Sequence, residues 1–107
     1  MKIIQSVEEF DDALNCDQMI MVDFFATWCP PCNKIAPDVE RLADEFPNVI
    51  FLSVDVDKEE TAELHGKDRY DVSSMPTFLF LKNAKVLDRI VGPDGIDSLK
   101  EMIQKLL

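Results

Sequence analysis

The sequence lacks any run of about 18 apolar residues, which is the length that a helix needs to cross a membrane. Its first residues, from Met1 to Ser6, also lack the order of charged, apolar and small residues that marks a secretory signal peptide. We therefore expect a soluble protein of a reducing compartment, with the cytoplasm as its location and no membrane as a partner.

Basic residues are scarce. The chain has 11 Lys and Arg against 21 Asp and Glu, which gives a formal net charge of -10. Nucleic acids and anionic membranes are bound through clustered Lys and Arg side chains. The composition therefore argues against both as partners, and it favours a partner protein with a basic docking surface.

Metal ligands are also scarce, with one histidine and three cysteines among 107 residues. A structural zinc site takes four Cys or His ligands, usually as two close pairs. Only Cys29 and Cys32 form a close pair here, and Cys16 and His65 are distant from it in the chain. We therefore predict no metal site, a free Cys16 in a helix-to-strand connection and His65 on the surface of a helix.

The cysteine pair itself points to chemistry. An odd number of cysteines argues against a framework of structural disulfides. In a cytosolic protein, a Cys-x-x-Cys pair beside a strand and a helix is typical of redox or metal chemistry. Since the metal ligands are too few, Cys29 and Cys32 indicate redox chemistry.

The chain has the length of one domain, residues 1–107, which can bury an ordinary hydrophobic core without disulfide or metal cross-links. No internal repeat, low-complexity tract or linker interrupts it. The apolar periodicity predicts alternating strands and helices. The strands fall at about 3–4, 19–26, 49–55, 77–81 and 86–91, and the helices at about 7–15, 30–46, from 57 and from 96.

This order, βαβαβαββα, predicts an α/β fold with a mixed five-stranded sheet flanked by four helices. The strand at 19–26 is apolar at nearly every position except Asp23, as in a parallel sheet that is covered on both faces. The last two strands are close enough in the chain for a β-hairpin. Ser6 and Glu9 have the spacing of a capping box for the first helix. The third helix, for which Asp57 is the expected cap, is only weakly specified.

Cys29 is predicted to cap the helix that begins at Pro30, because proline is favoured at the first helical position and keeps the preceding residue out of helical geometry. The sulfur then faces unpaired backbone N–H groups and the positive end of the helix dipole. Both stabilise a thiolate and lower the pKa of Cys29 below the usual value of about 8.5. Cys32 lies one turn further on the same face, where it can attack a mixed disulfide at Cys29.

Two residues near the cysteines and one distant peptide bond are ambiguous from the sequence alone. Asp23, buried in an apolar strand, either has a raised pKa and exchanges a proton with Cys32, or finds backbone donors and is merely tolerated. Trp28 is either an exposed contact surface or packed against the strand. The Met75-Pro76 bond is expected to be trans when taken alone, because only about 5–6% of X-Pro bonds in folded proteins are cis.

Several motifs in a shared order give the chain a resemblance to the thioredoxin family, and the likeness covers nearly all of it. Motifs in register over a whole domain are far more specific than a lone Cys-x-x-Cys. The resemblance implies the thioredoxin fold and a protein-disulfide reductase. The motifs are Val22-Asp23-Phe24-Phe25-Ala26-Thr27-Trp28-Cys29, Ile35-Ala36-Pro37, Val54-Asp55-Val56-Asp57, Met75-Pro76-Thr77-Phe78 and Gly92.

The resemblance also implies roles for the residues that match these motifs. Cys29 is then the nucleophile, Cys32 the resolving thiol and Asp23 the buried proton-transfer carboxylate. No bound cofactor is implied, because the reducing equivalents come from NADPH through a thioredoxin reductase. The partners are disulfide-containing proteins and that reductase, and we expect a monomer.

Substrate contacts follow from the same resemblance. Pro76 is implied to be a cis-proline that faces the cysteine pair. The backbone of Met75 is implied to pair with an extended substrate segment, as in β-strand addition. Trp28 and Gly92 border the implied contact surface.

The sequence departs from the family pattern between the cysteines, where Pro30-Pro31 replaces the usual Gly-Pro, so that the motif reads WCPPC in place of WCGPC. Neither proline has an N–H, so the first amide that can reach the Cys29 sulfur is that of Cys32. We therefore expect a thiolate that is stabilised by fewer direct donors, and a redox potential that the resemblance does not fix.

Three further departures lie outside the motif. The segment 57–76 is longer than usual, around Gly66 to Arg69. Ser53 stands where many members carry a charged residue near the buried acid. Ala84 takes a hairpin position where glycine is common, so a two-residue type I′ turn is strained there.

Two other functions stay open. The pair can act as a net oxidant or isomerase if the potential of its disulfide is high, since the potentials of such pairs span a wide range. The fold can also serve as a non-catalytic interaction module. The presence of both cysteines, the proline and the buried acid argues against that last function.

Overall fold

A mixed five-stranded sheet forms the centre of the computed structural model, which describes residues 1–107. The strand order is β1-β3-β2-β4-β5. Strand β3 pairs in parallel with β1 and β2, whereas β4 is antiparallel to β2 and β5. The strands are β1 (Lys2–Ile3), β2 (Ile20–Phe25), β3 (Ile50–Asp55), β4 (Thr77–Lys82) and β5 (Lys85–Val91).

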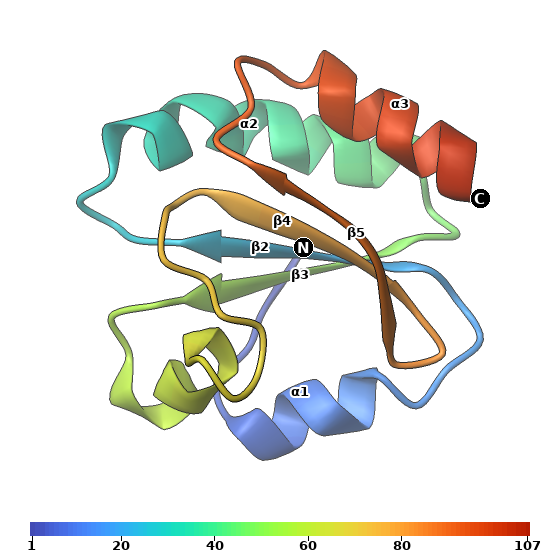
Figure 1. Ribbon diagram of the computed structural model, residues 1–107. Coiled ribbons are helices and arrows are strands. Elements are labelled where there is room, and N and C mark those ends of the chain that lie inside the picture. Colours follow the sequence, from blue (N-terminus) through green and yellow to red (C-terminus); the bar gives the residue numbers. More distant parts are fainter.

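Helices cover both faces of this sheet, so the predicted architecture is confirmed. Helices α2 and α3 lie on one face, and α1 and a 3-10 helix, η1, lie on the other (Figure 1). None of the helices is long and apolar enough to cross a membrane. The helices are α1 (Val7–Ala13), α2 (Pro30–Glu45), η1 (Glu59–His65) and α3 (Asp97–Leu106).

Strand β2 is buried on both faces, as its nearly continuous apolar sequence predicts. Alternate side chains enter two separate hydrophobic clusters, because successive residues of a strand point to opposite faces. Val22 and Phe24 join Phe10 of α1 in a cluster of 13 buried residues. Met21 joins Val39 of α2 in a cluster of 11 buried residues on the other face. The two clusters fix β2, and with it the start of α2, between the helical layers.

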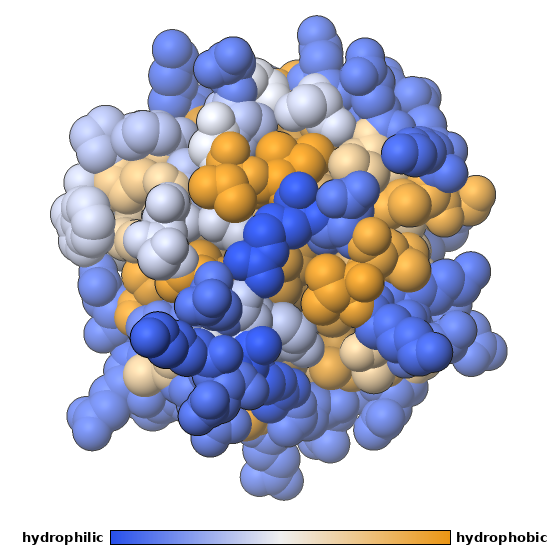
Figure 2. All heavy atoms as spheres, viewed as in Figure 1, coloured by the Kyte–Doolittle hydropathy of each residue, from blue (hydrophilic) through white to orange (hydrophobic).

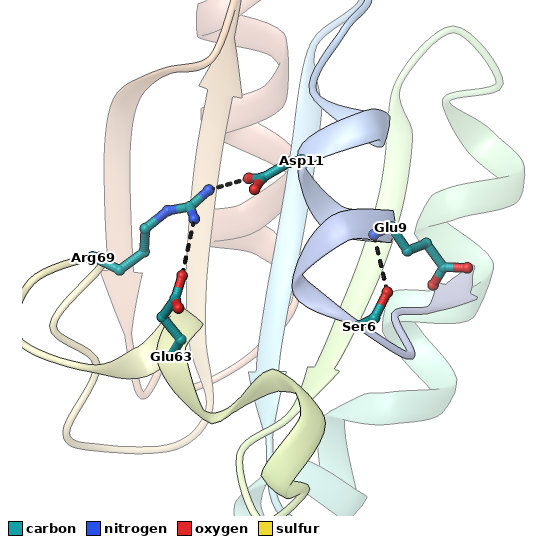
Figure 3. Close-up of polar contacts among 5 residues, drawn as sticks. All are labelled: Ser6, Glu9, Asp11, Glu63 and Arg69. Atoms are coloured by element: carbon teal, nitrogen blue, oxygen red, sulfur yellow. Dashed lines mark hydrogen bonds and ion pairs between the residues drawn. The ribbon is translucent and has the colours of Figure 1, made fainter.

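The predicted cap of α1 is present in a modified form. The Glu9 N–H donates to Ser6 Oγ (3.1 Å), a contact drawn in Figure 3. The Glu9 carboxylate, however, accepts from the N–H of Gln5 (2.8 Å) and not from the Ser6 amide of a standard capping box. Both bonds satisfy backbone donors that the helix leaves unpaired at this end.

The predicted cap of the third helix is wrong. Element η1 begins at Glu59, its cap is Lys58, and no side chain bonds there. Asp57 is held before the helix, since its N–H donates to Asp55 Oδ1 (3.0 Å). His65, expected on the surface, is instead half-buried, and its Nε2 is enclosed without a hydrogen-bond partner.

Arginine side chains fasten the longer segment that follows η1. Arg69 forms ion pairs with Asp11 of α1 and with Glu63 of η1 (Figure 3). Arg89 of β5 donates to the carbonyl oxygens of Tyr70 and Asp71. The segment is therefore tied to α1, to η1 and to the edge of the sheet before the chain enters β4.

The hairpin between β4 and β5 has the expected two-residue turn. Asn83 and Ala84 have φ angles of 52° and 65°, in the left-handed region. Asparagine tolerates this region, but the Cβ of alanine is crowded there. The strain expected at Ala84 is thus present in the backbone conformation.

Strand β5 is an edge strand with an exposed hydrophobic surface. Val86, Leu87 and Val91 are 45%, 43% and 52% exposed. Figure 2 shows patches of hydrophobic side chains on the face in view, with hydrophilic side chains between and around them. This surface lies beside the site described next, because Val91 directly precedes Gly92, which borders that site.

Candidate active site

The two cysteines lie where β2 ends and α2 begins, at the carboxyl end of the parallel strands (Figure 1). Cys29 is the N-cap of α2, with φ -90° and ψ 108°, and Pro30 is the first helical residue. The N–H of Cys32 donates to Cys29 Sγ (3.3 Å). Both the predicted cap and the predicted first donor are therefore confirmed.

Cys29 and Cys32 are joined by a disulfide, with their Cα atoms 5.3 Å apart. They are almost equally buried, at 4% and 5% exposed. Residue exposure therefore does not distinguish the two cysteines, whereas position does: Cys29 caps the helix, and Cys32 lies within its first turn. Such a pair can be cycled between dithiol and disulfide without moving the backbone far.

A cis peptide bond joins Met75 and Pro76 beside the disulfide. The carbonyl oxygen of Met75 lies 3.6 Å from Cys29 Sγ. The N–H of Gly92 donates to the Pro76 carbonyl oxygen (2.9 Å), and Gly92 has a φ of 56°, which glycine adopts without strain. The cis geometry agrees with the resemblance and not with the expectation from Met75-Pro76 alone.

These residues border a groove of about 520 Å³ next to the disulfide. Pro30 and Pro31 of α2 form one wall, and Met75, Pro76 and Gly92 form part of the other. The structure thus brings together residues that are far apart in the sequence, as the implied contact surface requires. The neighbouring Trp28 is 66% exposed, so its interpretation as an exposed surface is the correct one.

Asp57 belongs to this site, although the sequence suggested only a helix cap. Its Oδ2 accepts the indole N–H of Trp28 (2.6 Å). The parallel pairing of β2 and β3 offered a signal, because residues that follow two parallel neighbours meet at one edge of the sheet. The bond orients an exposed indole beside the cysteines.

Asp23 lies within β2, between Ser53 of β3 and Phe78 of β4. It is 6% exposed, and its Oδ1 has no hydrogen-bond partner. Burial removes the carboxylate from water and raises the pKa of Asp23 from 3.8 to about 7. The interpretation with a raised pKa is therefore supported, and the one with satisfied backbone donors is wrong for Oδ1.

No group of three or more His, Cys, Asp or Glu side chains is arranged to hold a metal ion. Cys16 is a half-buried free thiol, as expected. Its sulfur lies 3.7 Å from the carbonyl oxygens of Ala13 and Gln18, outside the site.

Comparisons with known proteins agree with this geometry. Residues 2–105 match the family model described as Thioredoxin. The chain is 38% identical to thioredoxin 1 of Plasmodium falciparum, over 98% of this chain and 96% of that protein. It is 40% identical to thioredoxin of Geodia cydonium, over 98% and 97% of the two chains.

Solved structures give the same result. The structure of Fasciola hepatica thioredoxin superposes with a TM-score of 0.84 at 39% identity and covers 98% of each chain. Both the sequence and the sheet with its helices are thus shared with these proteins over nearly the full length. The chain therefore belongs to the thioredoxin family, and it is a thiol–disulfide oxidoreductase with its redox disulfide between Cys29 and Cys32.

Proposed function

We propose that the protein is a protein-disulfide reductase in which Cys29 is the nucleophile and Cys32 the resolving thiol. The observation that carries this assignment is the position of Cys29 at the start of α2, where its sulfur accepts the N–H of Cys32. A thiolate is stabilised by such a donor and by the positive end of the helix dipole. Cys32, inside the helix, forms the second half of the pair.

The reaction begins with the dithiol form. The Cys29 thiolate attacks one sulfur of a partner disulfide, so that a Cys29–partner disulfide forms and the other partner sulfur leaves as a thiolate. The Cys32 thiolate then attacks Cys29. The Cys29–Cys32 disulfide forms, the mixed disulfide breaks, and the partner leaves with both of its sulfurs reduced.

Asp23 supports the second step by accepting the proton of Cys32. Both residues border one cavity behind the cysteine pair. A pKa of about 7 for Asp23 is close to the operating pH, where a carboxyl group can both accept and release a proton.

Partner disulfides bind in the groove at Met75, Pro76 and Gly92, with Trp28 at its border. Neither the N–H nor the carbonyl of Met75 forms a backbone hydrogen bond within the chain. The N–H is therefore free to pair with an extended segment of a partner, as in β-strand addition, and the carbonyl, which contacts only Cys29 Sγ (3.6 Å), can accept from the same segment. The net charge of -10 favours partners whose docking surface is basic.

The cycle also needs a source of electrons. We propose that they come from NADPH through a thioredoxin reductase, with no cofactor bound to this chain. We further propose that the protein is located in the cytoplasm. It acts as a monomer of one thioredoxin domain with the motif Trp28-Cys29-Pro30-Pro31-Cys32.

A reductant is favoured over a net oxidant by the few donors at Cys29. A thiol–disulfide protein is a strong oxidant when its reduced form is highly stabilised. Here Pro30 and Pro31 have no N–H, and the Cys32 amide is the donor to the Cys29 sulfur. A weakly stabilised thiolate gives a low potential, which measurement against a glutathione buffer checks.

The test is the reduction of insulin disulfides by dithiothreitol, with the wild type and Cys32→Ser compared. The wild type accelerates the reaction, whereas Cys32→Ser does not turn over and accumulates a mixed disulfide at Cys29. If the wild type gives no acceleration, the reductase function is wrong. If Cys32→Ser turns over normally, the assignment of Cys32 as the resolving thiol is wrong.

A further inference from the structure

The groove beside the disulfide carries charged side chains in addition to the residues already described. On the α2 wall, Lys34 and Asp38 follow Pro30 at intervals of four residues, so the three lie on one face of the helix. Figure 1 shows the loop from β5 to α3 beside the first half of α2, and this loop contributes Asp94 to the other wall. Lys34, Asp38 and Asp94 are the charged residues among the 11 that line the groove.

The charges are ordered along the groove. Lys34 lies closer to the cysteines, and Asp38 lies one turn further along α2. A helix rises about 1.5 Å per residue, so Lys34 is about 7.5 Å and Asp38 about 13.5 Å from Cys29 along the helix axis. Lys34 is exposed and forms no ion pair. Positive charge therefore comes before negative charge on the way out from the cysteine pair.

The outer end of the groove is acidic on both walls. Asp94 also borders a neighbouring hollow, to which Asp97 adds a second carboxylate. Both are exposed, and neither forms an ion pair. Asp38 does pair with Arg41, but the two side chains are 41% and 72% exposed, and ion pairs this exposed are weak. A basic side chain of a partner can therefore bind between the two walls.

An extended partner segment passes these charges in a fixed register. Its attacked cysteine lies at Cys29, and the free N–H of Met75 holds the backbone beside it. A strand rises about 3.3 Å per residue, so Lys34 lies about two residues and Asp38 about four residues away from the attacked cysteine. Side chains of a strand alternate between its two sides, so both of these positions point to the same side as the cysteine.

We propose that the groove selects partner segments by the order of their charges. The preferred segment has an acidic residue two positions, and a basic residue four positions, from the cysteine that Cys29 attacks. Lys34 determines the first preference, and Asp38 together with Asp94 determines the second. The inference rests on the proposed function, since it names the class of segment that this reductase reduces. The net charge of -10 favours basic partners in general, whereas the groove specifies where the basic residue stands.

Two synthetic peptides of identical composition test this register. Each has one cysteine, which is joined by a disulfide to thionitrobenzoate. The matched peptide has Glu two positions and Lys four positions from the cysteine on both sides, and the swapped peptide exchanges Glu with Lys. Their net charges are equal, so the overall charge of the protein acts on both alike. Because the charges stand on both sides, the test does not depend on the direction in which the segment binds.

The reduced protein carries Cys16→Ser and Cys32→Ser, so that Cys29 is its only thiol. The Cys29 thiolate attacks the peptide sulfur, and a Cys29–peptide disulfide forms. The bond to thionitrobenzoate breaks, and thionitrobenzoate leaves as a coloured anion that stopped-flow absorbance follows. Each rate is divided by the rate of the same peptide with β-mercaptoethanol, which corrects for the intrinsic reactivity of the two peptides.

We expect the matched peptide to react about 3- to 10-fold faster than the swapped peptide at low salt. In about 1 M salt the ratio approaches one, because salt screens exposed charges. Asp38→Asn/Asp94→Asn and Lys34→Gln each lower the ratio at low salt. Both rates in a ratio come from the same protein, so a general effect of a substitution on the reactivity of Cys29 cancels.

The matched control is Asp44→Asn/Glu101→Gln, which removes two negative charges from exposed positions outside the groove. Its ratio equals that of the parent protein. Equal normalised rates of the two peptides overturn the proposal, and so does a ratio that falls as much in the control as in Asp38→Asn/Asp94→Asn. If neither peptide releases thionitrobenzoate, Cys29 is not the nucleophile, and the proposed function fails instead.

Discussion

The backbone N–H of Cys32 donates to Cys29 Sγ across 3.3 Å, and it reaches over two prolines that have no N–H of their own. An N-cap side chain normally accepts from the second or third helical residue. Pro31 occupies the second position of α2 and Cys32 the third. The N–H of the second position is therefore missing, and only the N–H of the third can donate to the sulfur. The chemistry of Cys29 therefore depends on one amide and the helix dipole.

The first prediction concerns these missing donors. Pro30→Gly and Pro31→Ala each restore one N–H, and both are expected to lower the pKa of Cys29. Pro31→Ala has the larger effect, because its amide occupies the second helical position. Titration of the thiolate absorbance in the dithiol form measures the pKa. An unchanged pKa in both variants shows that the donors do not tune the site.

The sequence was sufficient for the elements that position the cysteines. The apolar run around Val22 predicted β2, and the stripe that includes Val39 predicted α2, because both patterns record burial directly. Proline at position 30 predicted the cap at Cys29. In each case the local sequence and the tertiary contacts favour the same structure.

The remaining parts of the site depend on contacts between distant segments. The bond from Trp28 to Asp57 forms because two loops meet at the carboxyl end of the sheet. The pairing of β2 with β3 brings the loops together, but the sequence of neither loop specifies the bond. The cis bond before Pro76 followed from the resemblance alone, since most such bonds are trans. His65 Nε2 is enclosed by tertiary packing. The weak apolar pattern of the segment around His65 did not predict this burial.

The second prediction follows from the burial of Asp23. Its pKa in the folded protein, about 7, lies above the ordinary value of 3.8, so the folded state binds the proton more tightly than the unfolded state does. The stabilisation is complete below about pH 4 and is lost as the pH rises through about 7. Above that, the buried charge costs on the order of a few kcal/mol.

Asp23→Asn removes this dependence. We expect the variant to be more stable than the wild type at pH 8, with the difference shrinking toward pH 5, because the amide stays neutral throughout. Urea unfolding of the wild type and of Asp23→Asn, both in the disulfide form, at several pH values measures this difference. A difference in the free energy of unfolding that is constant with pH contradicts the raised pKa.

The third prediction concerns the strained turn between β4 and β5. Ala84→Gly is expected to stabilise the protein by about 0.5 to 1 kcal/mol, because relief at the positive φ exceeds the added entropy of the unfolded chain. Asn83→Gly, at the other turn position, is the control and gains less, since asparagine already tolerates this region. Thermal unfolding ranks the two, and the reverse order would show that Ala84 is not strained.

The last prediction concerns the segment that precedes the cis-proline. Arg89→Met leaves the carbonyl oxygens of Tyr70 and Asp71 without their side-chain donor, and we expect it to cost about 1 to 2 kcal/mol. Arg69→Met breaks ion pairs to the exposed Asp11 and Glu63, which contribute about 0 to 1 kcal/mol.

The two arginine variants together separate a backbone anchor from surface charge. Hydrogen exchange of the amides between Gly66 and Met75 is expected to speed up in Arg89→Met more than in Arg69→Met, because only the first releases the backbone from β5. Salt weakens the effect of Arg69→Met and leaves that of Arg89→Met nearly unchanged, since screening acts on exposed ion pairs. Equal exchange in the two variants would mean that Arg89 does not hold the segment that leads to Pro76.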